Sequence, residues 1–365
     1  MFDKVKGNLG FGCMRLPLVD GEVDTAQFNL MVDRFISEGF NYFDTAHGYI
    51  DGKSERAIRD CLVSRYNRED FVLANKLSEW FINSAEDVRP LFSEQLRACG
   101  VEYFDFYLFH AINRESYEKH KRCHSFETVM ALRDEGKIKH IAMSFHDTAD
   151  ILDMILTEQP YIEAVQLQIT YLDYDDPTVQ SYECYKVAAK HGKKVIVMEP
   201  VRGGVLANKL PTEAIAEFEA LGDATPVSYA LRYAASYPEV FMVLSGMGSV
   251  EMVAENAKTM KPFIPLSQAE LSATDNARRI IRKYRQIPCT ACRYCADVCP
   301  KQIPIDSMFA IYNDYALAKI SRKQASASFS EFDVKATDCI ECGACEGVCP
   351  QSISIREKLQ KIAKL

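Results

Sequence analysis

The stretch that decides the fold begins with DVRPLFSEQLRACG at residues 87–100 and ends with FDFYLFH at residues 104–110. Its first part has the apolar spacing of an amphipathic helix, and Gly100 stands where such a helix commonly ends. Its second part is apolar almost throughout, as expected for a parallel strand that is covered on both faces. The stretch is therefore interpreted as a helix followed by a buried strand.

The same alternation extends in both directions along the chain. Eight apolar runs are predicted strands: 9–16, 41–46, 71–77, 104–110, 140–145, 164–169, 194–200 and 240–247. The predicted helices are 25–39, 54–66, 87–100, 126–136, 149–159, 179–192, 226–237 and 250–260. Eight such units predict an α/β protein built as a closed (β/α)8 barrel. A doubly wound open sheet is the rival, but the chain has no G-x-G-x-x-G turn after its first strand.

Composition narrows the class of protein. The chain has 365 residues, 26% of them charged, and a net charge of -8, which argues against nucleic acid or an anionic membrane as a partner. No apolar run approaches the roughly 20 residues of a membrane helix. The N-terminal stretch MFDKVKGNLG lacks the apolar core of a secretory signal, so we expect a cytoplasmic protein.

The length favours a barrel with a small appendage over one compact core. We expect the barrel at residues 1–263, a helical connector at 264–286, and a cysteine-rich domain at 287–365. Five cysteines are scattered through the first part and are expected to be small buried residues: Cys13, Cys61, Cys99, Cys123 and Cys184.

Polar residues stand at the ends of three neighbouring predicted strands. Asp44 ends the second strand and Tyr49 follows it, Lys76 ends the third, and His110 ends the fourth. Singly, each has an ordinary explanation: a helix cap, a solvated amine or a hydrogen-bonded core histidine. Active sites of such barrels lie at the carboxyl ends of the strands, so together the four residues predict an active site there.

The motifs DTAHGY at 44–49, GKSE at 52–55, NK at 75–76 and FDFYLFH at 104–110 resemble those of the aldo-keto reductase superfamily. The resemblance covers roughly residues 7 to 260. It implies that Tyr49, Lys76, Asp44 and His110 form a catalytic tetrad. It also implies reduction of a carbonyl, or oxidation of an alcohol, with a nicotinamide cofactor bound without a Rossmann fold.

The chemistry of these side chains agrees with those roles. A carbonyl that accepts hydride develops negative charge on oxygen and must then be protonated. A phenol has a pKa of about 10, and we expect the Lys76 ammonium to lower the pKa of Tyr49 and make it a usable proton donor. Asp44 would hold Lys76 in place, and His110 would donate a hydrogen bond to the carbonyl oxygen.

The resemblance also implies nucleotide contacts. Ser144 and Gln168 would bind the carboxamide, Met198 stands where the family usually stacks an aromatic ring, and residues 199–204 would cover the pyrophosphate. The full set is Asp44, Ser144, Gln168, Met198, Glu199, Pro200, Val201, Gly203, Gly246, Gly248, Glu255 and Asn256. The basic residues that many members carry around Gly246 and Met252 are missing, so we expect weak preference for NADP, with NAD or no tightly held nicotinamide as the alternatives.

Each of two further features has two interpretations. Residues 114–127 form a predicted loop after the strand of His110, with a basic cluster that is either solvated or binds an acidic substrate. Trp80 and Phe81 either line the substrate pocket or pack locally.

The C-terminal part contains two cysteine runs of identical spacing, C-x2-C-x2-C-x3-C-P at 289–300 and 339–350. This is the pattern of bacterial ferredoxins with two clusters, in which the fourth cysteine of each run serves the other cluster. The resemblance implies an α+β ferredoxin-like domain at residues 287–365. One [4Fe-4S] cluster is therefore assigned to Cys289, Cys292, Cys295 and Cys349. The other is assigned to Cys339, Cys342, Cys345 and Cys299. Zinc is the competing metal, because sites of four thiolates also suit it. The 39-residue insert between the runs contains the predicted helix IDSMFAIYNDYALAKI.

Clusters carry single electrons, whereas nicotinamides move two as hydride, so a flavin or a redox protein partner would be needed between them. The first hypothesis is an oxidoreductase acting on a small carbonyl or alcohol. The second is an electron-transfer or redox-sensing protein whose barrel binds nucleotide or flavin with little turnover. A third is that the clusters are structural.

Overall fold

The structure is a computed structural model that describes residues 2–222, 224–284 and 286–365. It divides into two compact units. The first, here called the barrel unit, comprises Met1–Pro200 and Val227–Leu266. The second, called the cysteine unit, comprises Val201–Pro226 and Ser267–Leu365. The segment Val201–Pro226 therefore groups with the C-terminal part of the chain, although it lies between two strands of the barrel.

The barrel unit is a closed barrel of parallel strands in the order β1-β10-β9-β8-β7-β6-β5-β4. All eight predicted strands are present: β1 (Leu9–Gly12), β4 (Tyr42–Asp44), β5 (Val72–Ser78), β6 (Phe104–Ile112), β7 (Ile138–Phe145), β8 (Ala164–Gln168), β9 (Lys194–Met198) and β10 (Val240–Ser245). The predicted (β/α)8 class is confirmed. A continuous ring of parallel pairing brings the carboxyl ends of all eight strands to one end of the barrel.

Alternation along the strands explains why they are apolar on both faces. In β6, Phe106 and Leu108 belong to the core inside the barrel. Tyr107 and Phe109 belong to the larger core between the strands and the surrounding helices. Successive side chains of a strand point to opposite faces, so both faces of this strand are buried and the whole run reads as apolar.

Helices of the barrel unit follow the strands in the predicted order: α1 (Thr25–Ser37), α2 (Lys53–Ile58), α3 (Ala85–Cys99), α5 (Ser125–Asp134), α6 (Ala149–Glu158), α7 (Ser181–Lys190), α10 (Pro226–Ala235) and α11 (Val250–Met260). A small hairpin of β2 (Leu18–Val19) and β3 (Glu22–Val23) was not predicted.

The predicted loop at residues 114–127 is wrong. Residues Arg114–Arg122 form helix α4, and α5 begins at Ser125. Asn113 starts α4 with a capping box, because its side chain accepts a hydrogen bond from the Ser116 amide at 2.8 Å while the Ser116 hydroxyl accepts from the Asn113 amide at 2.9 Å. His120 is buried and Lys119 pairs with Glu79 at 2.8 Å, so these two members of the basic cluster do not form a solvated loop.

The cysteine unit consists of helices and loops: α8 (Val205–Asn208), α9 (Thr212–Glu219), α12 (Gln268–Ile281), α13 (Tyr294–Asp297), α14 (Ile305–Ala316), α15 (Arg322–Ser330), α16 (Ala344–Gly347) and α17 (Ile355–Ile362). No strand is formed among its described residues, which differs from the expected α+β arrangement.

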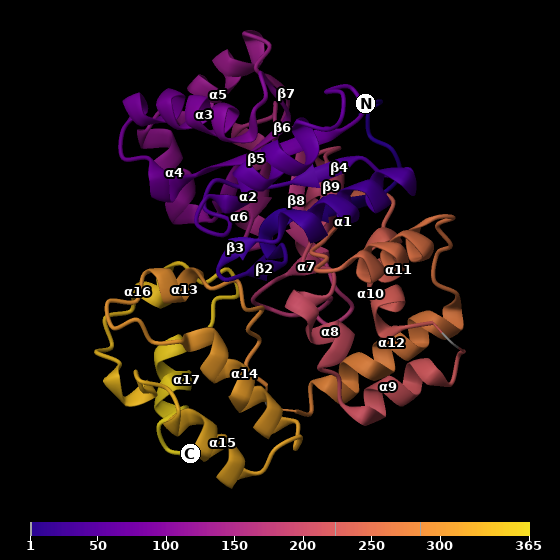
Figure 1. Cartoon of the computed structure of the whole chain (residues 1–365), viewed down its shortest axis with the longest axis vertical. Coiled ribbons are helices and arrows are strands. Elements are labelled where there is room, and N and C mark those ends of the chain that lie inside the picture. The colour runs from indigo at the N-terminus through magenta and orange to yellow at the C-terminus, as the bar shows by residue number, and fades with distance from the viewer. Residues whose placement is uncertain (1, 223, 285) are drawn as a thin grey trace. The chain divides into compact units, whose positions relative to one another are not determined.

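Two predicted helices organise this unit. The connector forms α12, which Ser267 begins with a capping box to Glu270, and it packs against α9 (Figure 1). The insert forms α14, where the Asn313 side chain bonds both the amide and the carbonyl group of Ile287 at 2.7 and 2.8 Å. This pair of hydrogen bonds fixes the chain immediately before the first cysteine run.

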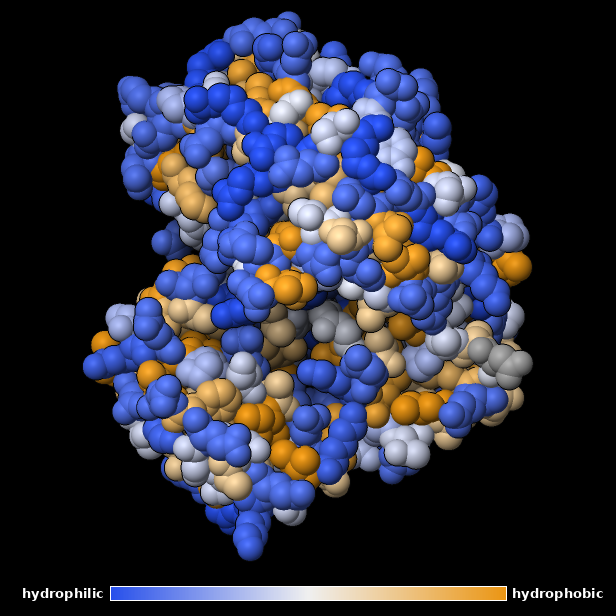
Figure 2. All heavy atoms as spheres, in the orientation of Figure 1, coloured by the Kyte–Doolittle hydropathy of each residue, from blue (hydrophilic) through white to orange (hydrophobic). Residues whose placement is uncertain are grey.

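Hydrophilic side chains cover most of the face seen in Figure 2, with hydrophobic ones among them in small groups. Such a mixture is ordinary for the surface of folded domains. Within the described ranges of the chain, no helix has both the length and the apolar character needed to cross a membrane.

Candidate active site and candidate cluster sites

Strand register brings three of the predicted catalytic residues to one end of the barrel. Asp44 ends β4, while Lys76 and His110 lie near the ends of β5 and β6. The ammonium of Lys76 lies 2.6 Å from Oδ1 of Asp44 and donates a second hydrogen bond, 2.8 Å long, to the carbonyl oxygen of Thr45. Both charged side chains are almost completely buried. A buried ion pair of this kind has a fixed geometry.

Tyr49 lies in the turn that follows β4, and its ring packs against the other members of the predicted tetrad. The Lys76 Nζ atom is 4.8 Å from the centre of the Tyr49 ring. The Tyr49 and His110 rings meet edge to face with their centres 5.9 Å apart. The structure therefore brings Asp44, Tyr49, Lys76 and His110 together around one point.

Burial sets the protonation of this cluster. Burial is the main reason that the pKa of Tyr49 lies well above its ordinary value, and the Asp44 carboxylate raises it further. The predicted net lowering of this pKa is therefore wrong, because burial and the Asp44 carboxylate outweigh the cationic groups nearby. Burial, and then the charge of Lys76, hold the pKa of His110 well below its ordinary value. Tyr49 is thus a neutral phenol and His110 a neutral imidazole.

The ion pair itself is subject to opposing effects. Burial lowers the pKa of Lys76 and raises the pKa of Asp44, while the short contact between the two groups counteracts both shifts. The second carboxylate oxygen of Asp44, Oδ2, is buried and has no hydrogen-bond partner among the described residues. An acceptor left in this state fits a site that awaits a hydrogen-bond donor from a bound ligand.

A polar network that the sequence did not reveal supports Lys76. Asn75 accepts hydrogen bonds from the Lys76 amide at 2.8 Å and from Gln95 at 3.1 Å, and it donates to Glu55 at 2.8 Å. Glu55 also pairs with His47 at 2.9 Å. The motifs GKSE and NK contain Glu55 and Asn75, so these residues fix the backbone that carries Lys76. The two motifs contain these residues, but the sequence did not show that they support Lys76.

Two aromatic residues left open by the sequence take different positions. Trp80 meets the His110 ring edge to face at 5.2 Å, so it lies against the predicted tetrad. Phe81 contacts His47 at 4.9 Å between ring centres and is 43% exposed.

Arg15 is a further residue that the sequence analysis missed. It lies in a short 3₁₀ turn after β1, and a Cβ placed on Gly246 would be 3.8 Å from the Cβ atom of Arg15. Its charge also acts on Tyr49, whose pKa it lowers against the larger opposing effects. The pairing of β1 with β10 brings Arg15 and Gly246 together, although they are far apart in sequence. A basic side chain therefore does lie beside Gly246.

The predicted carboxamide contacts lie at the ends of consecutive strands. Ser144 lies near the end of β7, and Gln168 and Met198 are register partners at the ends of β8 and β9. The Ser144 hydroxyl accepts a hydrogen bond from the Ala111 amide at 2.7 Å, and Gln168 donates to Asp173 at 2.9 Å. These contacts fix both side chains at the same end of the barrel as Lys76.

The remaining predicted nucleotide contacts are less uniform. Gly246 and Gly248 are exposed after β10, Glu255 is half-buried on α11, and Asn256 is buried and donates to Ser245 at 2.9 Å. The predicted pyrophosphate loop is divided between the units: Glu199 and Pro200 belong to the barrel unit, and Val201 and Gly203 to the cysteine unit.

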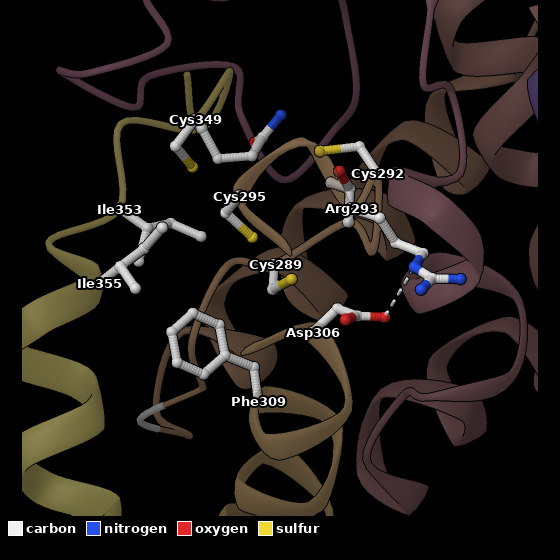
Figure 3. A pocket seen from close by; sticks show the side chains of 11 residues that line it. Cys289, Cys292, Arg293, Cys295, Asp306, Phe309, Cys349, Ile353 and Ile355 are labelled. Carbon is white, nitrogen blue, oxygen red and sulfur yellow. Dashed lines mark ion pairs between the residues drawn. The ribbon is translucent and has the colours of Figure 1, made fainter. Parts of the chain in front are cut away.

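The eight C-terminal cysteines surround two pockets. The first cysteine pocket is lined by Cys289, Cys292, Cys295 and Cys349, and the second by Cys299, Cys339, Cys342 and Cys345. In Figure 3 the sulfur atoms of the first set face a common space, with Phe309, Ile353 and Ile355 along one side. These are the two sets assigned from the sequence.

The two pockets fit a cluster better than a single ion. A zinc ion bound at about 2.3 Å by four thiolates draws the sulfurs close together. The spacing of the two cysteine runs is instead that of proteins that hold iron-sulfur clusters. Four cysteines spread around a pocket provide the donor chemistry of a larger iron-sulfur group. Donor type and spacing therefore favour an iron-sulfur group over zinc.

Fold and site together define an oxidoreductase with an iron-sulfur part. Residues 8–279 match the aldo/keto reductase family, and residues 288–353 match a 4Fe-4S dicluster domain. The chain belongs to the aldo/keto reductase family.

Relatives with known names are similar across the barrel. L-galactose dehydrogenase of Arabidopsis thaliana is 26% identical over 287 residues, covering 73% of this chain and 89% of that protein. Methylglyoxal reductase YeaE of Escherichia coli is 25% identical over 255 residues, covering 66% and 81%.

Solved structures show the same fold. The holo form of an aldo-keto reductase from Bacillus halodurans superposes with a TM-score of 0.60 at 24% identity, covering 74% of this chain and 91% of that one. An aldo-keto reductase from Klebsiella pneumoniae in complex with NADPH gives 0.58 at 22% identity, covering 73% and 89%.

Proposed function

We propose that the barrel interconverts a small carbonyl compound and its alcohol with a nicotinamide cofactor, and that Tyr49 is the proton donor. The observation that carries this proposal is the buried ion pair of Lys76 and Asp44 beneath the Tyr49 ring, with His110 beside it. Family membership and the NADPH-bound state of the Klebsiella pneumoniae protein support the choice of cofactor.

The proton balance follows from the protonation of these residues. When bound, a nicotinamide supplies the hydride that converts the carbonyl carbon to an alkoxide carbon. His110, as a neutral ring, donates a hydrogen bond to the carbonyl oxygen and orients it. Tyr49 then gives its phenolic proton to the alkoxide oxygen, which is a much stronger base than a phenolate. The phenolate left on Tyr49 lies beside the Lys76 ammonium, which stabilises it.

Cofactor preference is part of the proposal. We propose that Ser144 and Gln168 hold the carboxamide and that Met198 lies against the nicotinamide ring. The stretch Gly246–Met252 carries no basic residue, so we expect no strong preference for NADP, even though Arg15 lies beside Gly246. Titration of NADH and NADPH against the fluorescence of Trp80 tests this, and a clear preference for NADPH contradicts it.

Substitution of Tyr49 tests the role of the phenol. We expect Tyr49→Phe to lower the rate of aldehyde reduction by about 10²- to 10⁴-fold, the usual contribution of a general acid. Tyr103→Phe is the matched control, because Tyr103 precedes β6 at the opposite end of the barrel. Equal turnover of the two variants would remove Tyr49 from the mechanism.

For the cysteine unit we propose two [4Fe-4S] clusters that exchange single electrons with a separate redox protein. The grouping of the cysteines into two pockets supports this. We expect about eight irons per chain, since each cluster holds four. Cys295→Ser and Cys345→Ser should each lower the iron content by about half, and the double variant should lower it to near zero. Iron retained in the double variant would refute the assignment.

A further inference from the structure

The two cysteine pockets are built from a repeat of the sequence. Each lining residue of the first pocket has a counterpart in the second pocket at a separation of 50 positions, such as Cys289 and Cys339, or Ile303 and Ile353. Where the two residues of a pair differ in type, burial or contacts, the two pockets differ. The comparison therefore shows where the two pockets are chemically unequal.

Burial is unequal at three of the paired positions. Thr290 of the first pocket is 2% exposed, whereas its counterpart Ile340 in the second is 58% exposed. Gln351 of the first pocket is also buried, whereas its counterpart Lys301 is exposed. Cys342 of the second pocket is likewise exposed, while its counterpart Cys292 is half-buried.

The segment that follows β9 contacts two residues that line the first pocket. Gly203 lies against the backbone of Thr290, and a Cβ added to Gly203 would collide with the Thr290 carbonyl oxygen. Arg202 is buried and donates from Nη2 to Oε1 of Gln351 at 3.2 Å. All four residues belong to the cysteine unit. Thr290 and Gln351 therefore receive contacts from a segment that has no counterpart in the repeat.

The backbone of this segment is held in an unusual conformation. Arg202, Gly203 and Gly204 all have positive φ values of 49°, 61° and 92°. Such a conformation costs a residue with a side chain of the order of 1 kcal/mol or more, so it persists where the surroundings fix it. Arg202 is therefore fixed by its surroundings in the position from which it reaches Gln351.

Charge makes the two pockets unequal as well. In the second pocket Arg356 lines the cavity, but Glu346 binds its guanidinium at 2.7 and 3.0 Å and balances its charge. In the first pocket the counterpart of Arg356 is Asp306, which lies 4.0 Å from the guanidinium of the lining residue Arg293. There Arg202 donates to the side-chain amide of the lining residue Gln351. An iron-sulfur cluster gains one negative charge when it is reduced. Cations and hydrogen-bond donors near its sulfurs stabilise that reduced form, most strongly where water is excluded.

We propose that Arg202 is a positioning residue of the first cysteine pocket: through Gln351 it raises the midpoint potential of the cluster bound there and makes the two clusters unequal. The side-chain carbonyl oxygen of Gln351 accepts the hydrogen bond from Arg202. The amide nitrogen of Gln351 can then direct its N–H groups at a neighbouring anion. This inference rests on the proposed clusters. It adds a member from the β9–α10 segment to a site otherwise built from residues 289–355.

A potentiometric titration of the full chain tests the proposal. The protein is reconstituted anaerobically, and reduced clusters are counted by electron paramagnetic resonance at each potential. Iron and sulfide analysis of the unaltered protein comes first, since failure to find two clusters would contradict the proposed function rather than the role of Arg202. We expect Arg202→Gln to move half of the reducible signal to a more negative potential. Arg202→Lys, which keeps the charge, should move it less.

Two further variants make the result specific. Gln351→Leu removes the amide with little change in volume, so it should shift the same half of the signal in the same direction, and it serves where Arg202→Gln loses iron. Arg356→Gln, at the second pocket, should leave that half unchanged. Cys295→Ser removes a proposed ligand of the first cluster, so the half of the reducible signal that shifts in Arg202→Gln should be absent from this variant. Unchanged titrations of fully loaded Arg202→Gln and Gln351→Leu, or a shifting half that survives Cys295→Ser, would overturn the proposal.

Discussion

The hydroxyl group of Ser78 lies 2.5 Å from Nδ1 of His110, and both side chains are buried. The two residues are register partners on β5 and β6. A hydrogen bond donated by Ser78 to Nδ1 places the ring proton on Nε2, where it can be donated to a carbonyl oxygen. Ser78 thus determines which nitrogen of His110 carries the proton.

We expect Ser78→Ala to lower kcat/KM for carbonyl reduction by about tenfold, which corresponds to about 1.4 kcal/mol and the usual net worth of one hydrogen bond. Steady-state kinetics with an aldehyde substrate measure the effect. Ser93→Ala, on the exposed face of α3, is the control and should behave as the unaltered protein. A Ser78→Ala variant as active as this control would show that the hydroxyl does not set the state of His110.

Lys76→Met should abolish reduction and also destabilise the barrel. The substitution leaves the Asp44 carboxylate buried without its counter-charge, which costs about 3–5 kcal/mol in comparable cases. Urea denaturation followed by circular dichroism measures the change in the free energy of unfolding. The double variant Lys76→Met/Asp44→Leu, which removes both charges, should recover much of the stability but none of the activity. If the double variant recovered activity together with stability, the ion pair would not be needed for the reaction.

The pH dependence of the two reaction directions should differ. Burial and Asp44 raise the pKa of Tyr49, so the phenol stays protonated and reduction should not decline through Tyr49 up to about pH 9. Alcohol oxidation needs the phenolate, so its rate should rise by about tenfold per pH unit over the same range. Because the pKa of His110 is lowered, neither profile should show a step near pH 6.5. A decline of reduction between pH 7 and 9 would mean that Tyr49 is not the donor or that its pKa is lowered.

Gly203→Ala should disrupt the first cysteine pocket. The added methyl group would meet the Thr290 carbonyl oxygen, and the φ of +61° disfavours any side chain. We expect about half of the iron to be lost, because the second pocket does not contact this segment. Gly347→Ala is the control, since a Cβ at that position has no neighbour within 4 Å. Full iron content in both variants would show that Thr290 can move without loss of the cluster.

The barrel could be predicted because each strand is buried on both faces and therefore reads as an apolar run. Two kinds of feature could not be predicted: a helix with few apolar residues, and contacts between residues that are far apart in the sequence. Helix α4 has few apolar residues, and its start is set by the Asn113–Ser116 capping box. Arg15 and Gly246 meet because β1 pairs with β10, and Ser78 meets His110 because β5 pairs with β6. The grouping of the cysteines could be predicted because their spacing repeats. The contact of Arg202 with Gln351 could not be predicted, because it joins residues 149 positions apart.

The exchange of the fourth cysteine between the runs constrains the order of assembly during synthesis. Cys349 lines the first pocket although it is 50 positions beyond Cys299, the last cysteine of the run that provides the other three. While the ribosome is still translating the insert, neither pocket has its complete set of thiols. A complete set of four thiols in the first pocket therefore exists only after Cys349 has been translated, and a nascent chain that stalls in the insert presents three of these cysteines without the fourth.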